Sequence, residues 1–334
     1  MDKLTSMLVV TSRSNADGAL FAKAVLLARR VGARIHLFHC DAELAHVLRH
    51  SYDTQDTEKA WQASVLDHRG YLEALRASVH APDLDISIDT TCDSPLYERI
   101  IKKVLADRPD LVMKSPSGTH PLRRLTLDSN DWQLMRACPV TLMLVRGKIW
   151  GERPRFAALV DVSVEETPHL AEAIVHTSEY FALGCQGELD LVYSEKDEDG
   201  SQRTERAAAL DRLAREYRIG ADHVHVLSGD PDVTLPDFAA RQCYDGLVLG
   251  ALTHRKGIAA LVGTLTGRLV DVLDCDFVLV KRAARVRGYL EAGDLAPNEY
   301  SATRRPSPLS TRNSDGSRLC LPACRSATMR SAAI

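Results

Sequence analysis

Short runs of aliphatic and β-branched residues alternate along this chain with longer stretches in which apolar residues recur at helical spacing. This alternation is typical of a parallel sheet covered by helices, so we expect an α/β fold. The predicted strands are 7–11, 34–39, 85–89, 111–114 and 140–145 in the first half, and 156–160, 188–193, 223–227, 247–250 and 277–281 in the second. The predicted helices are 17–31, 58–79, 96–106, 165–182, 202–217, 233–243 and 264–273. The first of these ends before Gly32, a residue that favours helix termination.

The second half repeats the order of the first, which indicates a duplication. Pairs of short motifs support it: Asp93-Ser-Pro95 corresponds to Gly229-Asp-Pro231, and Cys138-Pro139 corresponds to Cys275-Asp276. We predict a first domain at 1–147 and a second at 155–282, joined by a linker around 147–155. The segment 283–334 is rich in Ser, Arg, Ala and Pro, and we expect it to be a disordered tail. A phosphorylated or nucleic-acid-contacting tail is the alternative to a non-functional extension.

Composition narrows the class of protein. The chain has 334 residues, enough for two cores, with 45% hydrophobic and 26% charged residues. A net charge of −3 makes nucleic acid an unlikely partner. We expect no membrane span, because no apolar stretch approaches about 20 residues. We expect no signal peptide, because the N-terminal apolar run 7–10 is too short for one. The eight cysteines lack metal-ligand spacing. Because we expect no secretion signal, we expect reduced thiols in the cytoplasm.

The stretch that follows the strand 247–250 carries the candidate chemistry. Gly250 is followed by Thr253, and Gly263, Thr264 and Leu265 open the next helical pattern. A strand, a glycine-bearing loop and a helix N-terminus place backbone N–H groups where they can bind phosphate. The alternative is that Gly250 and Gly263 serve only as turn and cap residues.

These residues resemble the nucleotide motif of the universal stress protein family, Gly-x2-Gly-x9-Gly-[Ser/Thr], with Thr253 in place of the second glycine. Asp161 matches an aspartate that ends the family's first strand, and 131–139 is similar to the tandem members of the family. The resemblance covers about 4–282. It implies two tandem five-stranded parallel-sheet α/β domains of the adenine nucleotide alpha hydrolase-like type, with strand order 3-2-1-4-5.

In that strand order the crevice lies between strands one and four, where ligands of open α/β sheets bind. The resemblance implies that ATP is the cofactor, in the second domain only. Asp161 and Ser194 would lie near adenine and ribose, while Gly250, Thr253, Gly263, Thr264 and Leu265 would hold the phosphates. The Thr253 hydroxyl is still able to donate to a phosphate oxygen.

The first copy lacks most of these features. It has Lys114 after strand four and no Gly-[Ser/Thr] before the helix, and Ser12 replaces the strand-one aspartate. We therefore predict a degenerate site without nucleotide, although another ligand, anionic or lipid-like, is an alternative.

Catalytic and metal-binding patterns are weak. His223 and His225 are expected on one face of a strand, either as a metal pair or as half-exposed residues. Cys40 and Cys92 both follow strands, and a redox role is the alternative to simple packing. No nucleophile–base pair is evident, so we predict no catalytic residues, no metal and no enzyme.

The family resemblance implies a cytoplasmic stress-response protein, including DNA-damage resistance, that acts through protein partners. A scaffold without nucleotide and a weak nucleotide hydrolase or adenylating enzyme are the alternatives. We expect the last strands of the two copies, 141–145 and 277–280, to pair within the chain, with a homodimer as a further alternative.

Overall fold

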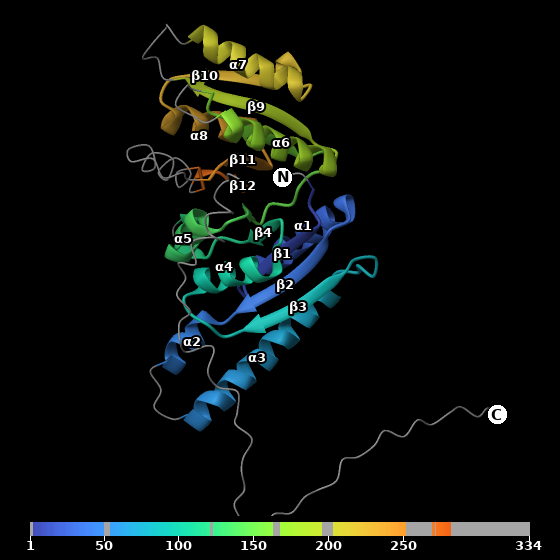
Figure 1. Cartoon of the computed structure of the whole chain (residues 1–334), viewed down its shortest axis with the longest axis vertical. Coiled ribbons are helices and arrows are strands. Elements are labelled where there is room, and N and C mark those ends of the chain that lie inside the picture. The colour runs from blue at the N-terminus through green and yellow to red at the C-terminus, as the bar shows by residue number, and fades with distance from the viewer. Residues whose placement is uncertain are drawn as a thin grey trace, which may run out of the picture. The chain divides into compact units, whose positions relative to one another are not determined.

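A computed structural model describes residues 3–49, 54–120, 123–162, 168–195, 203–251, 269–270 and 272–281. Within these residues, ten strands form one sheet in the order β10-β9-β8-β11-β12-β7-β4-β1-β2-β3 (Figure 1). The first half contributes β1 Ser6–Thr11, β2 Arg34–Cys40, β3 Ile86–Thr91, β4 Leu111–Lys114 and β7 Thr141–Leu144. The second half contributes β8 Arg155–Leu159, β9 Glu188–Glu195, β10 Val224–Ser228, β11 Gly246–Gly250 and β12 Asp276–Val280.

The helices of the first half are α1 Asp17–Val31, α2 Ala42–Arg49, α3 Thr54–Ala77, α4 Leu96–Asp107 and α5 Ser129–Ala137. Those of the second half are α6 Pro168–Cys185, α7 Arg203–Glu216 and α8 Pro231–Gln242, with a 3-10 helix at Ala221–His223. Leu269, Val270 and Val272 are also helical. None of the helices in the described part of the chain is both long enough and apolar enough to cross a membrane.

Each half of the sheet has its first strand in the centre and its fourth strand beside it. In the first half the order is β3-β2-β1-β4-β7, and in the second it is β10-β9-β8-β11-β12. All pairings within a half are parallel. The expected order 3-2-1-4-5 is therefore confirmed twice.

The two halves meet through their fifth strands. Strands β7 and β12 pair antiparallel, with Met143 opposite Val278, Leu144 opposite Phe277, and Leu142 opposite Leu279. The expected pairing of these two segments is thus present within one chain. Because the two strands run in opposite directions, the halves are related by an approximate two-fold axis through the Met143–Val278 pair.

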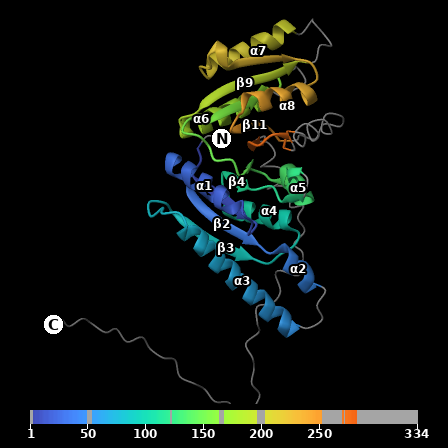
Figure 2. The same cartoon turned by 180° about the vertical axis from the view of Figure 1, so that it is seen from behind.

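Helices cover both faces of the sheet (Figures 1 and 2). One core lies under α1, α3, α6 and α7, and the other lies under α4, α5, α8 and the helical residues Leu269 and Val270. Both cores continue across the β7–β12 join, because each contains residues from both halves. Alternate residues of a strand enter opposite cores: Leu8 and Val10 enter one, Met7 and Val9 the other.

The strand registers correct one of the sequence matches between the halves. Leu111 begins β4 and pairs with Thr141, while Gly246 begins β11 and pairs with Asp276. Thr141 is therefore the counterpart of Asp276. Cys275 then corresponds to Val140 rather than to Cys138. The sequence match was wrong because it aligned the two Cys residues, whereas the strand pairing aligns Cys275 with Val140.

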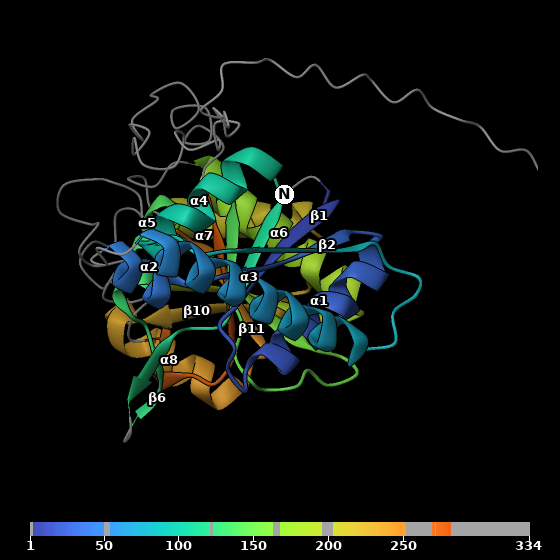
Figure 3. The ribbon, with the colours of Figure 1, turned by 90° about the horizontal axis from the view of Figure 1, so that it is seen from below.

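Two elements of the first half were not predicted. They are the short helix α2 and a two-stranded hairpin formed by β5 Gly118–His120 and β6 Arg123–Thr126. The hairpin projects outward from the helix layers (Figure 3). The predicted tail lies outside the described residues.

Candidate functional site

Three of the predicted site residues lie at the carboxyl ends of neighbouring strands. Leu159 of β8 is level with both Val192 of β9 and Leu249 of β11. One residue beyond Leu249 is Gly250. Asp161 and Ser194 each lie two residues beyond that level. The structure therefore brings these three together at one edge of the sheet, at the point where the strand order reverses. Thr253, Gly263, Thr264 and Leu265 lie outside the described residues.

Gly250 has a packing role that the sequence did not indicate. A Cβ at this position would lie 2.9 Å from Leu170 Cδ2 and 3.5 Å from Ile174 Cδ1, both on α6. Its missing side chain allows α6 to approach the end of β11. The packing explanation for this glycine therefore has direct support.

Ser194 is engaged with the start of α8. Its hydroxyl lies 2.7 Å from Thr234 Oγ1 and 3.3 Å from the Gly229 carbonyl oxygen. Thr234 in turn donates to the Asp230 carbonyl oxygen at 3.0 Å. The hydroxyl thus ties the end of β9 to the β10–α8 connection, at the same edge of the sheet as Asp161.

Sequence reasoning missed a charged group at the end of β9. Arg206 of α7 has Nη1 3.5 Å from Glu195 Oε1, at the end of β9. Burial raises the pKa of the neighbouring Tyr193; the charge of Arg206 opposes this shift and that of Asp161 adds to it. Arg206 lies in the predicted helix 202–217, and only the fold brings it to the end of β9.

In the first half, a lysine and an aspartate occupy the corresponding edge. Lys114 ends β4, and its Nζ lies 2.6 Å from Asp131 Oδ1 on α5, with both side chains buried. The ammonium also donates to Ser117 Oγ and to the Ser115 carbonyl oxygen. Burial raises the pKa of Asp131, and Lys114 opposes that shift.

The helix that follows is closed by its own carboxylates. Asp128 caps α5 and accepts a hydrogen bond from the Asp131 backbone at 2.7 Å. Asp131 accepts reciprocally from the Asp128 backbone at 3.2 Å, and from the Ser117 backbone at 2.8 Å. A helix N-terminus attracts anions, and at the start of α5 two side-chain carboxylates of the protein itself accept the hydrogen bonds.

Side chains of the protein also make hydrogen bonds and ring contacts at the carboxyl ends of β1 and β2. Asp17, which is buried, accepts from the backbone of Arg13 and from the hydroxyl of Tyr71, both at 2.8 Å. His68 Nε2 lies 3.0 Å from Asp41 Oδ2, and its ring lies 4.2 Å from that of His39. Burial, and secondarily the charge of His68, lowers the pKa of His39 to about 4. These contacts add to the prediction of a degenerate first site.

The two histidines of the second half do not share a strand face. His223 belongs to the 3-10 helix and His225 to β10, because the chain turns before the strand begins. Both imidazoles contact the carboxylate of buried Asp190, at 2.6 Å for His223 and 3.4 Å for His225. The same carboxylate is contacted by the Tyr244 hydroxyl at 2.6 Å and by the Arg155 guanidinium at 3.0 Å. Burial raises the pKa of Asp190, but hydrogen bonds from Tyr244 and His223 lower it, and the net shift is downward. The structure, as far as it is described, contains no group of three or more such ligands able to hold a metal.

The thiols near the first-half edge are not activated. Burial raises the pKa of Cys40 to about 12 and that of Cys92 to about 11. A reactive cysteine requires the opposite shift, since the thiolate is the nucleophile. These two residues therefore do not support the redox alternative.

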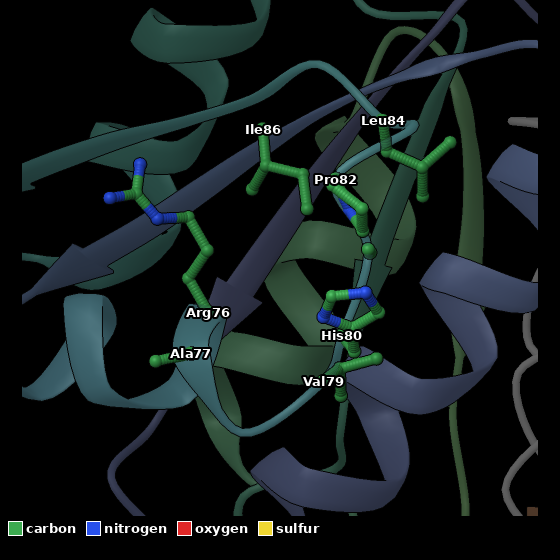
Figure 4. A pocket seen from close by; sticks show the side chains of 8 residues that line it. Arg76, Ala77, Val79, His80, Pro82, Leu84 and Ile86 are labelled. Atoms are coloured by element: carbon green, nitrogen blue, oxygen red, sulfur yellow. The ribbon is translucent and has the colours of Figure 1, made fainter.

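An open hollow of about 360 Å³ lies between the end of α3 and the start of β3 (Figure 4). It is lined by Arg76, Val79, His80, Leu84 and Ile86, among others. It lies at the amino end of β3, whereas the predicted site residues lie at carboxyl ends of strands.

Comparisons with known proteins agree with this architecture. The universal stress protein E of Photorhabdus laumondii subsp. laumondii is 23% identical over 301 residues, which cover 84% of this chain and 96% of that protein. The universal stress protein E of Escherichia coli strain K12 is 24% identical over 297 residues, covering 83% of this chain and 93% of that one.

Solved structures share the fold over the same length. A functionally unknown protein of Pseudomonas aeruginosa PAO1 superposes with a TM-score of 0.70 at 20% identity, covering 86% of this chain and 96% of that one. A universal stress protein of Archaeoglobus fulgidus gives a TM-score of 0.60 at 14% identity, covering 83% and 98%. The model of the universal stress protein family matches residues 4–146 and again residues 166–281. The chain therefore belongs to the universal stress protein family, with two copies of the family's domain in tandem.

Proposed function

We propose that this chain is a cytoplasmic stress-response protein whose second half binds an adenine nucleotide, ATP in the first instance, and whose first half binds none. The protein acts by binding rather than by turnover. Its expected contribution to stress resistance, including resistance to DNA damage, passes through protein partners that respond to the nucleotide-bound state.

The contrast between the halves carries this proposal. The counterparts of Lys114, Asp128 and Asp131, at the spacing set by the strand registers, are Leu249, Gly263 and Thr266. Where the first half supplies its own carboxylates to a helix N-terminus, the second half has a glycine and a threonine. An external anion such as a phosphate is the complement that this exchange favours.

The convergence of Asp161 with Gly250 at one sheet edge is the second support. A carboxylate at the end of strand one is suited to accept from ribose hydroxyls. Gly250 is able to serve both packing and ligand binding, because its missing side chain allows contact with α6 while its backbone still ends β11 at that edge.

Titration of the full chain with ATP tests the proposal. We expect saturable binding that Gly263→Val abolishes. Gly151→Val is the matched control, because a Cβ on Gly151 meets nothing within 4 Å. ATP that co-purifies with the wild-type protein, detected by mass spectrometry, would be a second sign of binding.

Absence of binding at millimolar ATP would contradict the proposal. It would favour the alternative function, a scaffold that binds no nucleotide, which the β7–β12 pairing supports. Phosphate release that Gly263→Val removes would instead favour the weak hydrolase.

A further inference from the structure

A buried ion pair connects the two halves at one of two positions that the approximate two-fold axis relates. Lys23 Nζ of α1 lies 2.7 Å from Asp276 Oδ2 of β12, and the two side chains are 7% and 1% exposed. Among the described residues, neither of the two forms any other salt bridge. The pair therefore matches a cation of the first half with an anion of the second half.

The counterpart of Lys23 follows from the ends of the first helix in each half. Gly32 follows α1 and Gln186 follows α6, and both residues have a positive φ. Equal steps back along the sequence from these two residues lead to Lys23 and Thr177. A threonine in α6 therefore takes the place that the lysine has in α1.

The counterpart of Asp276 is also a threonine. The strand registers align Asp276 with Thr141 of β7. Thr141 and Thr177 are both buried, as Lys23 and Asp276 are. One position of the β7–β12 join is thus ionic while its symmetry-related position carries hydroxyl residues, so the edges of the two halves differ chemically.

The groups around the ion pair also come from both halves. Lys23 donates to the Arg146 carbonyl oxygen at 2.9 Å. The Asp276 carboxylate accepts from the Arg146 backbone at 2.6 Å and from the Trp150 indole at 2.7 Å. The Arg146 guanidinium in turn donates to the Val270 carbonyl oxygen in the second half. As far as the structure is described, every donor to this carboxylate of the second half belongs to the first half or to the linker.

This chemical difference decides which edges are compatible. If two first halves paired through β7, each Lys23 would face Thr141 of the other copy instead of a carboxylate. If two second halves paired through β12, each Asp276 would face Thr177 of the other copy. Either arrangement buries charges without opposite charges beside them, which is far less favourable than burying a matched pair.

We infer that the Lys23–Asp276 pair is the selectivity element of the join: it pairs a first half with a second half and excludes pairing of like halves between two copies of this chain. The partner that fits the β7 edge is a β12 edge. Because the linker tethers these two edges, they meet within one chain at high effective concentration. The inference does not depend on nucleotide binding.

A disulfide cross-link in the full chain detects pairing of like halves. Met143 lies opposite Val278 in the native join, but in a join of two first halves it would lie opposite Met143 of the other copy. Met143→Cys therefore allows a disulfide between two chains only when first halves pair. Exchange of halves between two chains keeps position 143 opposite Val278 and gives no such cross-link.

The chain is unfolded in urea, refolded at high protein concentration and oxidised, and the covalent dimer is measured by non-reducing electrophoresis. The chain with Met143 intact gives the background from the native cysteines, of which Cys243 is exposed. Met143→Cys alone, which retains the ion pair, is expected to give no dimer above this background.

The decisive variant combines Met143→Cys with Lys23→Met and Asp276→Asn, which removes both charges and keeps an acceptor at 276. We expect the dimer to increase by about tenfold or more, because like halves no longer bury unmatched charges. The matched control combines Met143→Cys with Lys114→Met and Asp131→Asn, which removes a buried ion pair inside the first half. Its dimer should stay within about twofold of the chain that retains both pairs.

Circular dichroism shows whether each variant has refolded. If Lys23→Met with Asp276→Asn does not fold, Lys23→Thr with Asp276→Thr, which places the residues of the neutral position at both, is measured in the same way. Failure of both variants to fold would overturn the inference, because the pair would then be required for the join itself.

Three results from folded chains would also overturn it. The first is an equal amount of dimer with and without the Lys23–Asp276 pair. The second is dimer above background in the Met143→Cys chain that retains the pair. The third is an equal increase of dimer in the Lys114→Met, Asp131→Asn control, because any loss of stability would then promote cross-linking.

Discussion

Lys23 of α1 and Asp276 of β12 form a buried ion pair across the two halves of the chain, with Nζ 2.9 and 2.7 Å from the carboxylate oxygens. Lys23 also donates to the Arg146 carbonyl oxygen at 2.9 Å. Burial raises the pKa of Asp276 to about 6, against the opposing charge of Lys23. The join between the halves thus contains a charge pair as well as the apolar contacts of β7 and β12.

Removal of the lysine alone should be strongly destabilising. Lys23→Met leaves the Asp276 carboxylate buried without its cation, for which we expect a loss of about 3 kcal/mol or more in the free energy of unfolding. Urea denaturation followed by circular dichroism measures it. Arg29→Met, which removes an exposed pair with Asp83, is the control and should change stability little. Equal effects of the two changes would contradict the structural role of the Lys23–Asp276 pair.

The same carboxylate predicts a pH dependence. An aspartate whose pKa is about 6 in the folded chain, and ordinary when unfolded, binds more protons in the folded state between about pH 4 and 6. Its contribution to stability therefore falls as pH rises through that window and is constant above it, a change of about 3 kcal/mol. Stability measured against pH for the wild-type chain and for Asp276→Asn isolates the effect. The difference between the two curves should vanish if Asp276 titrates normally.

His39 predicts the opposite slope. Its pKa of about 4 in the folded chain means that the unfolded chain binds more protons between about pH 4 and 6.5, so stability rises with pH in that window. Because the ring is buried, we expect a contribution of up to about 3 kcal/mol. Comparison of His39→Gln with the wild-type chain over this range measures it, and parallel curves would refute the prediction.

The first-half ion pair can be tested by a double-mutant cycle. Lys114→Met should destabilise the chain by about 3 kcal/mol, because buried Asp131 loses its cation. Lys114→Met with Asp131→Leu removes both charges, and so should cost less than the sum of the single changes. Additive losses would show that the two side chains do not interact.

The contact between Gly250 and α6 gives a prediction that separates packing from ligand binding. Gly250→Ala should destabilise the chain by about 1–2 kcal/mol, because the new Cβ would lie 2.9 Å from Leu170 Cδ2. A second change, Leu170→Val, shortens that side chain and should recover part of the loss attributed to Gly250→Ala. If stability recovers but ATP binding does not, Gly250 serves the ligand as well as the packing.

Much of the fold could be predicted because its signals are local. The helix α1 has the predicted bounds, since Gly32 adopts a left-handed conformation at φ 72° and its N–H bonds the Ala28 carbonyl oxygen. Strand order and the pairing of the fifth strands followed from the family resemblance and are confirmed. The short helix α2 and the β5–β6 hairpin were missed because too few residues carry a periodic pattern.

The candidate site was less accessible to prediction because its contacts join distant parts of the sequence. Lys114 was identified as a departure from the nucleotide motif, but its pairing with Asp131 depends on where α5 lies over β4. The contact of Arg206 with Glu195 and the contact of Arg146 with Val270 depend likewise on tertiary packing. The position of Thr253, Gly263, Thr264 and Leu265 relative to Asp161 remains a prediction.

Fusion of the β7 and β12 edges in one polypeptide frees each half from the identity that a symmetric dimer imposes. In a dimer of identical subunits, every substitution changes both sites at once. Here the two edges are tethered, which keeps their effective concentration high without collision between molecules. In this chain one half has Lys114 and Asp131 at its sheet edge and the other has Gly250 and Gly263 in its sequence, while the same β7–β12 pairing joins both.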